Sequence, residues 1–142
     1  MKEKEFDIKM MIEGLKKLYQ KYEKLRKEIS EMEDELQRIL TKHGWTEDYV
    51  KEHVIYINKR WVKNKIGQKY YYFWLVVKHR GEVIENVYLG STVRKELEEE
   101  VNDFRRAKEL LIKIEDLKYY FDRCRKRLRE IEDILIFEEV YP

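Results

Sequence analysis

One stretch of the sequence concentrates the residue types that could bind a polyanion. Between Val54 and Gly81 it holds seven Lys and Arg residues and no Asp or Glu. Aromatic residues are interleaved with these bases, a combination that suits nucleic acid, because cations neutralise phosphates and flat rings stack on bases or sugars. The candidate phosphate contacts are Lys59, Arg60, Lys63, Lys65, Lys69, Lys78 and Arg80, and the candidate base or sugar contacts are Trp61, Tyr70, Tyr72 and Trp74.

The formal net charge of +2 averages two unlike parts of the 142 residues. The acid-free stretch carries +7, so the other 24 of the 31 bases and all 29 acids leave −5 on the remainder. Charged edges also deter strands from aggregating, which explains some lysines but not the absence of acids. The bases between Arg123 and Arg129 alternate with acids nearby, so we expect them to form a solvated helix face.

The residue patterns of common catalytic and cofactor sites are absent from the sequence. His43, His53 and His79 lack the spacing of metal ligands, and the single cysteine, Cys124, cannot form a zinc cluster or an internal disulfide. No phosphate-binding loop or dinucleotide glycine pattern occurs. We therefore expect no enzyme activity, metal, cofactor or small-molecule substrate. Cys124 lies on an apolar helical stripe, so we expect a buried structural thiol.

Two long helices are expected to hold the basic stretch. In the first, from Glu5 to His43, apolar residues recur at alternating steps of three and four from Ile8 to Ile39. Gly44 suits the C-cap of this helix. A helix of this length cannot bury its own stripe, so the pattern predicts a helical partner.

The second long helix is expected from Val93 to Phe137, with Ser91 or Thr92 as N-cap and glutamates in its first turns. The simplest interpretation of the two stripes is an antiparallel coiled-coil hairpin within one chain. A parallel homodimer along the first helix is the alternative. Residues 138–142 form a tail that packs, frays or binds a partner.

Between the helices the sequence predicts a short helix, Glu47 to His53, capped by Thr46. Three strands follow, at Val54 to Val62, Lys69 to Lys78 and Val83 to Leu89. The glycines that mark their boundaries are Gly67, Gly81 and Gly90. We expect a three-stranded antiparallel β-meander and hence an α+β, mainly α, fold. Its parts are residues 1–44, 45–90, 91–137 and the tail, in one structural domain.

The middle strand is apolar on both of its faces. We expect one face to pack on the helices. The other should form a half-wet binding surface, since Tyr and Trp combine an apolar body with a polar edge.

The strand region is similar to a known domain. Its pattern is strand, Gly-basic-Tyr-Tyr, strand, Gly-Glu-Val, strand, Tyr-Leu-Gly, carried here by residues 56–90. This pattern resembles the small three-stranded domain at the N-terminus of integrases of archaeal spindle-shaped viruses, and small proteins of archaeal viruses and plasmids. The chain inserts one residue between Gly67 and Lys69 and lacks the His-x-x-Arg of the recombinase catalytic part. The resemblance implies a DNA-binding head without recombination chemistry.

These observations predict a non-enzymatic nucleic-acid-binding accessory protein of an archaeal virus or mobile element. We expect DNA or RNA as partner and a homodimer through the coiled coil. The alternative is a coiled-coil scaffold or virion assembly protein whose sheet contacts other proteins. No apolar run reaches the roughly 18–20 residues of a membrane span, and no secretory signal is recognisable. We therefore expect no membrane partner and a cytoplasmic protein, in the host cell if viral. The abundance of Lys and Glu fits a thermophile.

Overall fold

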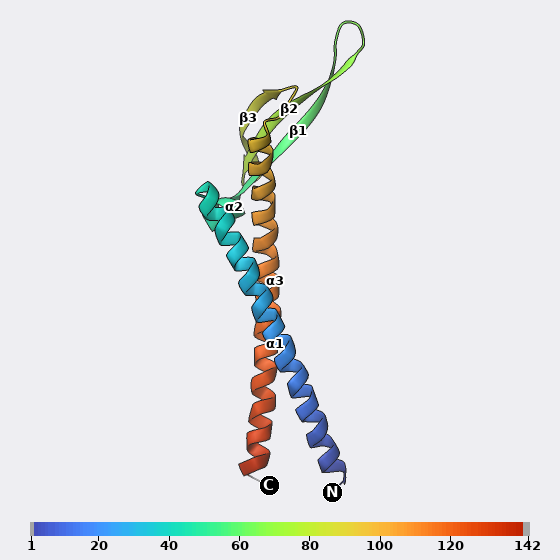
Figure 1. The fold of residues 1–142 in the computed structure, drawn as a ribbon, viewed down its shortest axis with the longest axis vertical. Coiled ribbons are helices and arrows are strands. Elements are labelled where there is room, and N and C mark those ends of the chain that lie inside the picture. The colour runs from blue at the N-terminus through green and yellow to red at the C-terminus, as the bar shows by residue number, and fades with distance from the viewer. Residues whose placement is uncertain (1, 141–142) are drawn as a thin grey trace. The chain divides into compact units, whose positions relative to one another are not determined.

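The computed structural model describes residues 2–140, and the side chains of residues 7–134. The predicted mainly helical α+β class is confirmed, with one small antiparallel sheet (Figure 1). The elements are α1 (Lys2–His43), α2 (Glu47–Glu52), β1 (His53–Lys63), β2 (Lys69–His79), β3 (Glu82–Gly90) and α3 (Lys95–Val140). Helix α3 thus takes up the first residues of the expected tail, while Tyr141 and Pro142 lie outside the described residues.

The chain divides into two compact units. The helical unit comprises the chain up to Asp34 and from Lys113 onwards, and therefore contains parts of α1 and α3. The sheet unit is the continuous segment Glu35–Ile112, which contains the rest of both helices, α2 and all three strands.

Two predicted helix caps are confirmed in the sheet unit. Gly44 has a φ of 68°, and the N–H of Trp45 donates to the carbonyl of Leu40 at 3.0 Å, the bond that closes a Schellman motif at the end of α1. The hydroxyl of Thr46 accepts a hydrogen bond from the N–H of Tyr49 at 3.1 Å, which caps α2.

The predicted cap of α3 is wrong. The N–H groups of Leu97 and Glu98 both donate to the carbonyl of Arg94 at 3.1 Å, so Arg94 occupies the position that precedes the helix. Ser91 and Thr92 lie in the bend between β3 and α3, because the chain needs these residues to turn out of the sheet. The expected acidic first turn is present.

The sheet is the predicted antiparallel meander, with the strand order β1-β2-β3. Strands β1 and β2 pair along their whole length, from His53 opposite His79 to Lys63 opposite Lys69. Strand β3 pairs with β2 only as far as Phe73. The β1–β2 hairpin therefore continues beyond β3 as a two-stranded ribbon, which we call the β-arm and define as residues 59–73, counted from the pair Lys59–Phe73 at which β3 ends (Figure 1).

The core of the sheet unit surrounds Phe104 of α3, which is 1% exposed. The rings of Trp45 and Tyr49 meet Phe104 edge-on, with centroids at 5.2 and 6.2 Å. Val76 and Val77, which point to opposite faces of β2, are both buried. Both faces of β2 are thus covered at this end, and the open half-wet face expected along the whole strand is confined to the other end.

Ion pairs also hold α1 to α3 inside the sheet unit. Arg106 donates two hydrogen bonds to Glu35, at 2.9 and 3.0 Å, and these bonds to the carboxylate raise the pKa of the Arg106 guanidinium. Asp103 accepts a bond from Lys42 at 3.0 Å and lies 2.7 Å from the ring nitrogen of His43.

The helical unit has its own apolar cluster, centred on Leu25, Cys124 and Leu128. Tyr22 and Phe121 pack against this cluster, and their rings stack on each other with centroids 4.7 Å apart. Cys124 is buried, as predicted, and its thiol donates to the carbonyl of Leu18 at 3.5 Å. These contacts join the middle of the two helical segments.

The outer part of the α1 stripe is less buried than its periodicity suggests. Ile8 and Met11 are 41% and 36% exposed. Figure 1 gives the physical reason, because within this unit the two helices separate towards their ends. Polar contacts between the segments include an ion pair of Glu33 with Lys118 at 3.0 Å and a hydrogen bond from Tyr19 to Glu132.

Candidate nucleic-acid interface

The turn of the β-arm is organised by Asn64. Its side-chain oxygen accepts hydrogen bonds from the N–H groups of Ile66 at 3.0 Å and Gln68 at 2.9 Å. Its backbone carbonyl accepts a bond from Gly67 at 3.1 Å, and Gly67 has a φ of 82°, which favours glycine. The turn is therefore a type I turn closed by a left-handed glycine, a common hairpin geometry that fixes the register of the arm.

One face of the β-arm carries three lysines, and we call it the lysine face. Lys59, Lys63 and Lys69 project to this side together with the rings of Trp61 and Tyr71, as the strand register requires. The ammonium of Lys59 lies 3.5 Å from the ring centroid of Tyr71, and that of Lys69 lies 5.9 Å from Trp61. Trp61 is 55% exposed, so the lysine face presents ammonium groups next to a solvent-exposed indole ring.

The opposite face carries Arg60, whose guanidinium carbon lies 5.3 Å from the ring centroid of Trp74. Trp74 and Tyr72 in turn contact Tyr88 of β3, with centroids at 5.0 and 5.9 Å. These two predicted base-contact residues therefore belong to an aromatic cluster at the base of the arm. Tyr70 lies further out, and its hydroxyl donates to the side-chain oxygen of Gln68 at 2.8 Å.

The described carboxylates leave the lysines near the tip of the β-arm without an ion pair. No carboxylate among the described side chains forms an ion pair with Lys63, Lys65 or Lys69. Lys63 and Lys69 even face each other directly across the two strands, where like charges destabilise a hairpin. Accumulated positive charge that costs stability is typical of a surface that binds an anion.

The structure does not bring all seven predicted bases together. Lys65 lies in the turn of the arm and joins the four bases on its strands, but Lys78 and Arg80 lie at the other end of β2. Arg80 pairs with Glu52 at 3.2 Å, and this bond, aided by one from His79, lowers the pKa of the Glu52 carboxyl. The ammonium of Lys78 lies 5.5 Å from the ring centroid of Tyr56.

Sequence reasoning passed over Asn64, Ile66 and Gln68. Asn64 and Gly67 form an Asn-x-x-Gly sequence between two strands, which indicates a tight turn and could have identified the tip. The length of the arm had no such signal, because it depends on where β3 stops pairing with β2.

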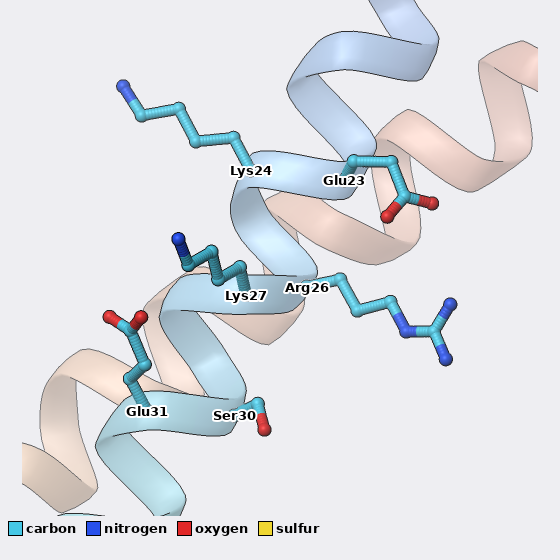
Figure 2. A pocket seen from close by; sticks show the side chains of 6 residues that line it. All are labelled: Glu23, Lys24, Arg26, Lys27, Ser30 and Glu31. Carbon is cyan, nitrogen blue, oxygen red and sulfur yellow. The ribbon is translucent and has the colours of Figure 1, made fainter.

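Two surface hollows of the described residues outside the β-arm do not assemble a competing site. The hollow in Figure 2, about 640 Å³, lies on α1 alone, and its side chains spread to two sides of the helix instead of converging. Its lining residues are Glu23, Lys24, Arg26, Lys27, Ser30 and Glu31. Another hollow, of about 660 Å³, lies where β3 leads into α3 and mixes both charges.

The part of the chain that the structure describes holds no group of His, Cys, Asp or Glu residues arranged to bind a metal ion. Within the same residues, no helix is long and apolar enough to span a bilayer. Comparison of the chain with known protein families, curated proteins and solved structures finds no match.

Proposed function

We propose that this protein binds duplex DNA through its β-arm, with little preference for sequence and without catalysis. The observation that carries the proposal is the arm itself. It is a ribbon that extends beyond β3, has no acidic residue, and presents Lys59, Lys63, Lys65, Lys69 and Arg60 around exposed rings.

The distribution of these bases favours a groove over a flat surface. The lysine face carries three cations and the opposite face carries Arg60, so positive charge lies on both sides of the ribbon. A ribbon that enters a DNA groove meets a phosphate backbone on each side, and β-ribbon proteins are known to use either groove. Phosphate neutralisation releases counterions and supplies most of the affinity.

The polar side chains near the tip argue against direct sequence readout. Asn and Gln read adenine when their amides are free. Here the oxygen of Asn64 accepts two backbone N–H groups and its nitrogen donates to the hydroxyl of Tyr70 at 3.3 Å, while Gln68 accepts from the same hydroxyl. With both ends of the Asn64 amide and the oxygen of Gln68 engaged, the arm offers mainly cations and rings, which contact any sequence.

For the helices we propose an antiparallel coiled coil within one chain, with a second copy joined along the outer faces to give a dimer with two arms. The inner contacts of Leu25, Cys124 and Leu128 support the first part. Tyr119 and Tyr120, 61% and 53% exposed on α3, support the second. Light scattering after gel filtration tests the dimer. A monomeric mass at a protein concentration of about 100 µM contradicts it.

The residue pattern over residues 56–90, which resembles the N-terminal domain of archaeal viral integrases, implies the same class of ligand, and on it we propose an accessory role for a mobile element. Such a protein acts in the cytoplasm, where that DNA is found.

Fluorescence anisotropy with labelled 24-bp DNA, the same single strand and a 24-bp RNA duplex tests the proposal. The DNA duplex should bind most tightly, and its affinity should fall steeply with salt. Absence of duplex binding at about 50 mM salt, or an affinity insensitive to salt, contradicts the proposal. Tighter binding of the single strand or of RNA would reassign the ligand.

A second candidate, an assembly protein, is favoured by the exposed residues of β3. Val83, Ile84 and Tyr88 are each more than half exposed on the strand that ends the sheet. Sheet edges of this kind pair with other strands. Under this alternative, Ile84→Lys disrupts an oligomer while Lys63→Ser with Lys69→Ser leaves it intact.

A further inference from the structure

The summit of the β-arm carries an apolar side chain that nothing in the sheet unit covers. Ile66 is 83% exposed, and among the described residues no other large apolar side chain is as exposed. Its sequence neighbours are Lys65 and Gly67, and the exposed Val62 and Tyr70 lie just below it on the ribbon.

Isolated apolar residues are common on protein surfaces, but the backbone of Ile66 is held in place. Its N–H donates to the side chain of Asn64 at 3.0 Å, and the following Gly67 bonds back to the Asn64 carbonyl at 3.1 Å. Two further bonds close the turn, one between Asn64 and Gln68 along the backbone and one to the Asn64 side chain. The isoleucine is therefore presented from a fixed support, so its insertion into a ligand costs little conformational entropy.

We propose that Ile66 inserts as a wedge between two base pairs of the bound duplex, from the minor groove, and kinks the DNA. This inference rests on the proposed DNA binding. Proteins that bend DNA from the minor groove combine apolar wedges with basic contacts to the flanking backbone. Here Ile66 supplies the wedge, and Lys63, Lys65 and Lys69 lie close enough along the arm to hold the phosphates beside the opened step.

An anionic lipid surface is the other partner that a basic, apolar tip could meet. A flat surface would contact the tip only, and one isoleucine gives it little apolar area. The bases at Lys59 and Arg60 lie on opposite faces at the base of the arm. They could not reach a flat surface together, whereas the two walls of a groove could contact both. The duplex is therefore the partner that the arrangement favours.

The first test measures the bend directly. A 24-bp duplex with a donor dye and an acceptor dye at its ends is titrated with the full chain, with Ile66→Ser and with Ile84→Ser as matched control. Ile84 is 54% exposed on β3, outside the arm, so both substitutions remove one exposed isoleucine. Wild type and Ile84→Ser should raise energy transfer at saturation. Ile66→Ser should bind about tenfold more weakly with the same salt slope and leave energy transfer unchanged.

The second test uses a duplex in which two central base pairs are mismatched, which lowers the cost of unstacking that step. Wild type should bind it at least about tenfold more tightly than the intact duplex, because the wedge then opens the step at lower cost. Ile66→Ser should lose this preference.

Three results would overturn the wedge: salt-dependent binding by wild type without a rise in energy transfer, equal bending by Ile66→Ser, or binding to phosphatidylcholine–phosphatidylserine vesicles that depends on Ile66 while the duplex stays straight. The first of these leaves the proposed DNA binding intact. Absence of any duplex binding overturns both proposals together.

Discussion

The facing lysines of the β-arm give a quantitative prediction about salt. Lys63 and Lys69 lie opposite each other on the lysine face and have no carboxylate partner among the described residues. Replacing both by Ser removes two phosphate contacts and also relieves their mutual repulsion. The variant should therefore fold at least as stably as wild type, so a loss of binding cannot be attributed to unfolding.

The magnitude follows from the number of bases on and beside the arm. If all five contact phosphates, the logarithm of the affinity falls against the logarithm of salt with a slope of about −4.5, or about 500-fold between 50 and 200 mM. With three contacts the slope becomes about −2.7 and the same change of salt costs only about 40-fold. The difference is large enough for anisotropy titrations at four salt concentrations.

The matched control removes the same net charge at the other end of β2. Lys78→Ser is combined with Arg80→Asn, because Arg80 has a φ of 50° that asparagine tolerates. Arg80 already pairs with Glu52, so this control should keep the wild-type slope. The reasoning is refuted if the arm variant keeps the wild-type slope, or if the control lowers it by as much.

Four further predictions concern the support of the arm and the two units. Asn64→Ala should weaken duplex binding several-fold at an unchanged salt slope and speed amide exchange at the tip, because it removes the side-chain bonds that fix the turn. Hydrogen bonds from His43 and Lys42 lower the pKa of the Asp103 carboxyl. The stabilisation from these bonds is therefore complete above about pH 4 and is lost as the pH falls through the lowered pKa. In urea unfolding curves, Asp103→Asn should reduce the fall in unfolding free energy at acid pH. Leu128→Ala should cost the helical unit about 2–5 kcal/mol in the same assay, and Cys124 should react with a thiol reagent only after unfolding.

Most of the fold could be predicted from the sequence because its signals are local. The heptad spacing and Gly44 indicated a helix ending at His43, and the structure ends α1 there. Glycines between alternating segments indicated the meander, and all three strands lie within a residue of their expected bounds. The prediction of the α3 cap was wrong because a serine or threonine caps a helix only when it directly precedes the first turn. Here four residues, 91–94, separate β3 from α3, and Arg94 is the last of them.

The candidate site was only half predictable. Composition identified the acid-free basic stretch, but strand pairing decides which bases lie together. Arg80 and Lys63 look equivalent in the sequence. Arg80, however, pairs with Glu52 at the end of α2, whereas Lys63 projects from the β-arm. Trp61 and Trp74 likewise separate into an open ring and a ring in a cluster with Tyr88, because β3 reaches only one of them.

The most direct measurement removes the arm and keeps the sheet. Residues 61–71 are replaced by Asn-Gly, which joins the paired residues Arg60 and Tyr72 in a two-residue hairpin turn and leaves every pair between β2 and β3 in place. The shortened chain should keep the helical circular dichroism of wild type and lose duplex binding by at least about a hundredfold at 50 mM salt, since it loses three of five bases. A folded, shortened chain that binds duplex DNA as tightly as wild type would contradict the central claim that the β-arm is the nucleic-acid interface.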